Sequence, residues 1–99
     1  SGEPQAKGGG AQDRKARAAA RETYKALQKA QEQAEKRVGK LQAEIGRYDR
    51  AMFEPASAAP DLAKLTMGDL AQQRSKLAKE LEEAEMAWLE AGEALETAS

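Results

Sequence analysis

The stretch Phe53-Glu-Pro-Ala-Ser-Ala-Ala-Pro-Asp61 lies near the middle of a 99-residue chain and decides how that chain folds. Each of its two prolines lacks an N–H donor and clashes with the preceding helical turn, so a straight helix cannot run through both. Long segments of helix-forming composition lie on either side. The chain is therefore predicted to bend here, between two helices of nearly equal length.

Apolar residues on both sides of the bend recur at alternating spacings of three and four, which is typical of a heptad repeat. We call these positions the seam; Gln31 interrupts it before the bend and Arg74 after it. Two seams joined by a tight bend predict an all-α fold, namely a two-helix antiparallel coiled-coil hairpin with a proline-bounded turn.

Capping residues predict where the two helices begin. Asp13 can cap the first helix. For the second, Asp61 directly after Pro60 is one candidate, and Thr66 with Asp69 three residues later is a capping-box pattern. The expected elements are a first helix over about 13–52, a turn over about 53–61 and a second helix over about 62–97, together a hairpin over 13–98.

The heptad frame also predicts which residues face each other. Placing Ile45 opposite Leu70 and Leu27 opposite Trp88 matches an a position to a d position at each level, as antiparallel packing requires. This register places Trp88 in the core. Near the bend, Leu62 and Leu65 are expected to fold over the seam as a cap.

Phe53 and the other apolar residues beside the prolines are expected to belong to the same cap. A partly exposed Phe53 or Leu62 would instead suit docking into a partner groove or stacking on an unpaired base. Both interpretations stay open at the level of sequence.

The beginning of the chain has a different composition. Three glycines in a polar opening predict a flexible linker over 1–12, and a start at Ser1 rather than Met suggests a piece of a larger protein. Apolar runs are too short for a membrane span. We therefore expect a cytoplasmic protein with no membrane contact, and a monomer.

Composition argues against catalysis in this segment. The chain has no cysteine and no histidine, which removes thiolate nucleophiles, imidazole bases and the usual zinc ligands. Glutamates on the second predicted helix have no further layer to bury them, so they are expected to be solvated charges. We predict neither an enzyme active site, nor a metal site, nor a cofactor bound by these residues.

Charge is distributed unevenly although the net charge is −1. Residues 1–50 contain 12 basic and 7 acidic side chains, and residues 51–99 contain 4 and 10. In the heptad frame, cations occupy the outward positions of the first helix and could follow a phosphate backbone. The candidate nucleic-acid-binding residues, which we call the basic face, are Lys15, Arg21, Lys25, Lys29, Lys36, Lys40, Arg47 and Arg50.

The run Leu81-Glu-Glu-Ala-Glu-Met-Ala-Trp-Leu-Glu-Ala-Gly-Glu-Ala-Leu-Glu96 follows a proline-bounded bend and a leucine-rich seam. With its single Trp88 followed by Leu89 and Glu90, it resembles the C-terminal domain of ABC-F family ATPases such as the Uup group. The resemblance covers roughly residues 14–97. It implies an antiparallel coiled-coil hairpin that contacts structured DNA or ribosomal RNA.

The same resemblance implies a parent protein whose ATP-binding cassettes precede this segment and bind ATP and Mg. A proline-bent hairpin is also similar to the tRNA-contacting coiled-coil arm of valyl-tRNA synthetases, although the late Trp88 favours the ABC-F family. A third interpretation is a purely structural hairpin that mediates protein contacts. Salt-dependent binding to nucleic acid separates the third from the first two.

Overall fold

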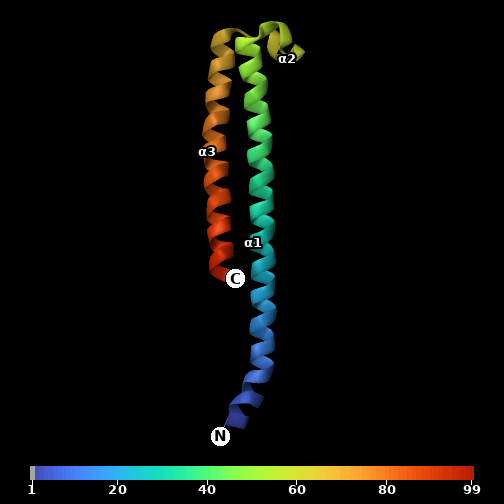
Figure 1. Ribbon diagram of the computed structural model, residues 1–99, viewed down its shortest axis with the longest axis vertical. Helices are drawn as coiled ribbons and strands as arrows, with labels where there is room; N and C mark the ends of the chain where they lie inside the picture. Colours follow the sequence, from blue (N-terminus) through green and yellow to red (C-terminus); the bar gives the residue numbers. More distant parts are fainter. Residues whose placement is uncertain (1) are drawn as a thin grey trace.

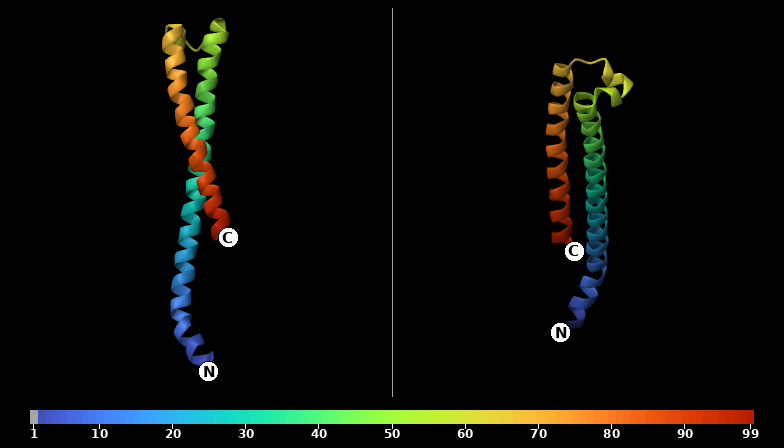
Figure 2. Two further views of the ribbon diagram at one scale, coloured as in Figure 1. Left: turned by 90° about the vertical axis from the view of Figure 1, so that its left-hand side faces the viewer. Right: turned by 45° about the horizontal axis from the view of Figure 1, so that its top comes forward.

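The computed structural model describes residues 2–99, with side chains from residue 10 onward. Helix α3 returns alongside helix α1 in the opposite direction, which makes an all-α helical hairpin 78 Å long (Figures 1 and 2). No strand occurs among the described residues. The elements are α1 (Gly2–Phe53), the 3-10 turn η1 (Pro55–Ser57), the short helix α2 (Pro60–Ala63) and α3 (Met67–Ala98).

The two long helices are unequal, with 52 residues in α1 and 32 in α3. Near its amino terminus, α1 extends beyond the end of α3 (Figure 1). The expected cap at Asp13 is therefore wrong, because Asp13 lies inside α1. Propagating a formed helix adds one hydrogen bond per residue, so the alanine-rich sequence continues α1 backward. The linker predicted over 1–12 falls largely outside the described side chains, and its backbone from Gly2 is helical.

The predicted bend is confirmed, and the prolines begin its two small elements. Pro55 is the first residue of η1 and Pro60 the first of α2, positions where a missing N–H removes no intrahelical bond. No residue in the described part of the chain has a positive φ. The connection runs over 54–66 and is longer than the predicted turn over 53–61, because α2 ends before α3 begins.

The capping pattern at the start of α3 is confirmed. The backbone N–H of Asp69 donates a hydrogen bond to Oγ1 of Thr66 at 3.1 Å, so Thr66 is the N-cap. Asp69 also places a negative charge in the first turn, where the helix dipole favours it. Asp61 does not cap α3; it lies in the first turn of α2.

A small core closes the tip of the hairpin. Leu62 from α2 is 3% exposed and packs with Ala51 from α1 and Leu70 from α3, so the predicted role of Leu62 is confirmed. Leu62 already fills the space between the helix ends. Leu65 and Phe53 therefore remain outside, and Phe53 is 77% exposed, so the prediction that they join the cap is wrong.

The rest of the hairpin has a thin core. Among the described residues, Leu41 and Ile45 are buried on α1, and Ala84 and Ala91 are buried on α3 further from the bend. Trp88 is 37% exposed, so its predicted place in the core is wrong.

The register differs from the predicted one by about one heptad. Leu70 belongs to the same buried cluster as Ala51, nearer the bend than its predicted partner Ile45. Further along, the amide nitrogen of Gln31 lies 3.0 Å from the position a Cβ atom on Gly92 would occupy. These contacts place the partners on α3 about seven residues later than predicted, a shift that keeps every a position opposite a d position.

The longer connection explains this shift. Because α3 begins at Met67 and not near residue 62, the midpoint of the turn moves from about residue 57 to about residue 60. In an antiparallel pair of helices, moving the midpoint of the turn by one residue along the chain moves the residue that faces a given position by two. The facing residues are therefore expected to move by about six positions. The heptad repeat favours a shift of seven, because that shift keeps a positions opposite d positions.

Candidate nucleic-acid interface

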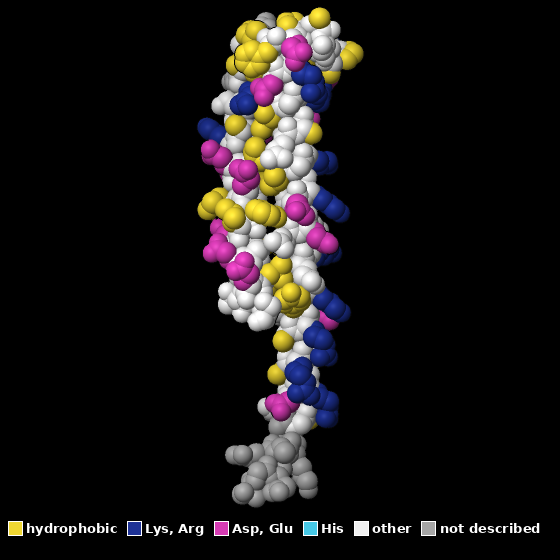
Figure 3. Space-filling model, viewed as in Figure 1, with side chains coloured by type: hydrophobic (Ala, Val, Ile, Leu, Met, Phe, Trp, Pro, Cys, Tyr) yellow, Lys and Arg dark blue, Asp and Glu magenta, His cyan; other side chains and the backbone are white. Residues whose placement is uncertain are grey.

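The basic face follows α1 for most of its length. From Lys15 to Arg50 it spans about 50 Å, at 1.5 Å of rise per residue. All of its members are exposed except Arg47, which is partly buried. Figure 3 shows Lys and Arg side chains gathered along the outer edge of α1, with several Asp and Glu side chains over α3. The cations thus lie along the side of α1 that is turned away from the acidic helix α3 (Figure 3).

Most cations of the basic face form no ion pair with a described carboxylate. Lys25 lies 4.0 Å from Glu22 on the same helix, at a site where both side chains are highly exposed. Such a pair contributes little, since solvent screens it. Among the described residues, six members of the face form no ion pair: Lys15, Arg21, Lys29, Lys36, Lys40 and Arg50.

Arg47 has a structural role that the sequence did not indicate. Its guanidinium donates hydrogen bonds to Glu44 and to Asp61, each at 2.6 Å. The pair with Asp61 joins α1 to α2 and so holds the connection against the long helix. Arg47 was predicted to bind nucleic acid, but its charge is already compensated by two carboxylates.

The Arg47–Asp61 pair predicts an effect of acid on the tip. The hydrogen bond from Arg47 lowers the pKa of Asp61 below its ordinary value of 3.8. A carboxyl whose pKa is lowered by folding adds stability above its unfolded pKa, and that stability is lost as the pH falls through the folded pKa. The tip should therefore loosen only below about pH 4.

An NMR titration of the Asp61 carboxyl checks this prediction. In the wild-type chain the midpoint should lie below 3.8, and Arg47→Gln should return it close to that value. Arg50→Gln removes a neighbouring exposed arginine and serves as the matched control, with no change expected. An unchanged Asp61 midpoint in Arg47→Gln would show that the ion pair does not form.

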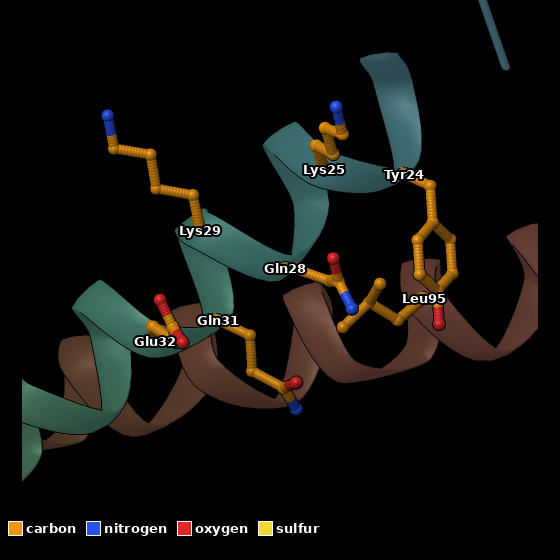
Figure 4. A pocket seen from close by; sticks show the side chains of 7 residues that line it. All are labelled: Tyr24, Lys25, Gln28, Lys29, Gln31, Glu32 and Leu95. Carbon is orange, nitrogen blue, oxygen red and sulfur yellow. The ribbon is translucent and has the colours of Figure 1, made fainter. Parts of the chain in front are cut away.

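Two lysines of the basic face, Lys25 and Lys29, point away from the contact between the helices (Figure 4). Figure 4 shows Lys25 and Lys29 directed outward from α1, whereas Tyr24, Gln28 and Gln31 are directed toward α3. These residues and Leu95 line a hollow where the carboxyl end of α3 meets α1. Polar side chains thus occupy the seam here without reducing the exposure of the cations.

A second hollow has a more apolar lining. Trp88 and Leu89 of α3 face Val38 of α1 across it, and the charged residues Glu35 and Glu85 lie at its sides. The predicted register did not indicate this site, because it placed Trp88 opposite Leu27. The correct register could have been found from the Thr66 cap, which starts α3 later than the prolines alone suggest.

The polar and charged side chains of the described residues all reach solvent. None of their polar or charged side chains is buried, and no group of three or more acidic side chains among them could hold a metal ion. Within the same part of the chain, no helix combines the length and apolar character that crossing a membrane requires. Exposed charge is therefore the chemical feature that the fold presents.

Comparisons of the chain with protein-family models, with curated proteins and with solved structures found no match.

Proposed function

We propose that this hairpin is an accessory arm that contacts the phosphate backbone of a nucleic acid through α1. The observation that supports the proposal is the set of six exposed cations without a described ion-pair partner: Lys15, Arg21, Lys29, Lys36, Lys40 and Arg50. An arm of this kind binds by charge and shape rather than by reading bases, because phosphate contacts are independent of sequence.

The spacing of the cations suits an extended ligand. Lys29, Lys36 and Lys40 lie within three helical turns on one exposed side of α1, and Arg50 continues the line toward the tip. The acidic residues of α3 would repel a polyanion from the other helix. Binding should therefore use one side of the hairpin, with the long axis of α1 along the nucleic acid.

The resemblance of the second helix to ABC-F C-terminal domains gives this arm a place in a larger protein. On that proposal the helix pair packs as an antiparallel coiled coil, and the preceding ATP-binding cassettes bind ATP and Mg. This segment would then supply nucleic-acid contact without catalytic residues of its own. Structured DNA and ribosomal RNA are the two ligands that the resemblance favours.

Binding titrations over a series of salt concentrations test the proposal. Affinity for branched DNA, duplex DNA and tRNA is measured with the wild-type chain, and the logarithm of the binding constant is plotted against that of the salt concentration. Each phosphate neutralised adds about −0.9 to the slope on B-DNA, so we expect about −3 to −5 for contacts by about three to six cations. Absence of binding to all three ligands at low salt would contradict the proposal.

The same experiment separates the alternatives. Strong preference for tRNA over both DNA ligands would favour the synthetase-type arm. Oligomers that form with increasing protein concentration, without nucleic-acid binding, would favour a structural hairpin; analytical ultracentrifugation of the same samples measures this.

A further inference from the structure

Phe53 stands out because the fold leaves it in solvent. It is the last residue of α1 and is 77% exposed, the highest value among the large apolar side chains that are exposed in the described residues. The tip core of Ala51, Leu62 and Leu70 is complete without it. Exposing an aromatic ring has a hydrophobic cost, which a ligand that covers the ring would remove.

Several internal contacts hold together the tip of the hairpin, where Phe53 lies. The Glu54 N–H donates to the Arg50 carbonyl oxygen at 2.7 Å, which closes the end of α1. The Arg47–Asp61 ion pair then holds α2 against this helix, and Leu62 of α2 is buried. The backbone that carries Phe53 is therefore held by these contacts, so it would lose little conformational entropy when a ligand binds.

Phe53 also lies at the end of the basic face. Arg50 precedes it by three residues, so the two exposed side chains are neighbours on one side of the last helical turn. Glu54, which follows Phe53 directly, carries the nearest negative charge in sequence. A polyanion that follows α1 toward the tip would thus reach an aromatic ring after its last phosphate contact.

We propose that Phe53 stacks on an unpaired base where a duplex opens, while Arg50 binds the adjacent phosphate. A phenyl ring takes any base, since each base has a stacking face, and this contact needs a base that is not already stacked in a duplex. The inference rests on the proposed nucleic-acid function and narrows its ligand to a junction between paired and unpaired strands.

The test compares a forked DNA with two unpaired arms and a blunt duplex of the same paired sequence. Phe53→Ala should weaken binding to the fork by about 5- to 100-fold and leave binding to the blunt duplex unchanged. Phe53→Leu retains apolar area without a ring and should behave like Phe53→Ala. Met67→Ala, which removes another exposed apolar side chain at the tip, is the matched control and should bind both ligands as the wild type does.

A fluorescent base at the first unpaired position gives an independent readout. Fluorescence of 2-aminopurine should be quenched by the wild-type chain and much less by Phe53→Ala at saturating protein, with folding of each variant checked by circular dichroism. Equal effects of Phe53→Ala on fork and blunt duplex, or none on either, would overturn the stacking role while leaving the phosphate contacts in place. Failure of the wild-type chain to bind either DNA would overturn the proposed function and this inference together.

Two other occupants of the tip would produce different results. Binding of the wild-type chain, but not Phe53→Ala, to anionic phosphatidylserine vesicles without discrimination between the two DNA ligands would assign the ring to a lipid surface. A protein partner at the tip would leave the affinities of Phe53→Ala for both DNA ligands at wild-type values. Either result would overturn the proposed base contact.

Discussion

Leu70→Ala should lower the free energy of unfolding by about 2–4 kcal/mol, the largest effect expected from a single substitution in this chain. Leu70 is 4% exposed and packs at once against Ala51 of α1 and Leu62 of α2. Truncating it leaves a cavity at the place where all three helices meet. The thin seam along the hairpin cannot compensate, because outside the tip the buried residues among those described are Leu41, Ile45, Ala84 and Ala91.

Urea unfolding followed by circular dichroism at 222 nm measures this effect. Leu89→Ala is the matched control, since it makes the same chemical change on α3 at a side chain that is 51% exposed. We expect a cost of about 1 kcal/mol or less for the control. Equal costs for Leu70→Ala and Leu89→Ala would mean that the tip core does not stabilise the hairpin.

Reversing three charges on α1 should have the largest effect on function. The triple variant Lys29→Glu, Lys36→Glu and Lys40→Glu should lower affinity for nucleic acid by on the order of 100-fold at low salt. Each lysine is exposed on one side of α1, so the substitutions should preserve the fold. The expected loss comes from removing three phosphate contacts and adding three repulsive charges.

A control with the same net charge separates local contact from overall charge. Lys64→Glu, Lys76→Glu and Lys79→Glu alter three exposed lysines in the connection and on α3. This variant should lose less than about tenfold, because only the long-range field changes. Fluorescence anisotropy with labelled duplex DNA measures both variants. Equal losses would show that binding follows net charge and has no fixed surface.

Much of the fold could be predicted because local rules and the hydrophobic pattern agree. Pro55 and Pro60 required a bend, the spacing of apolar residues required two helices, and Thr66 with Asp69 marked the start of α3. The register could not be predicted from periodicity. A seven-residue repeat pairs a with d positions equally well after a shift of seven, so the pattern sets which side faces the partner and not the level.

The interface was predictable in part for a related reason. Outward heptad positions are exposed in any such pair, which correctly placed Lys29 and Lys36 in solvent. The partner of Arg47 could not be inferred, because Asp61 approaches it only through the fold of the connection. Phe53 shows the same limit: its exposure depends on Leu62 filling the tip core first, a competition between neighbours that sequence spacing does not reveal.

On the proposed function, nucleic acid lies along the outer side of α1. The most direct measurement is a two-dimensional ¹⁵N–¹H NMR spectrum of the labelled chain, recorded while a short forked DNA is added. We expect the perturbed amides to lie on α1 around Lys29, Lys36 and Lys40 and to continue to Arg50, with the amides of Glu82–Glu96 on α3 little affected. Perturbations confined to α3, or none at saturating DNA, would contradict it.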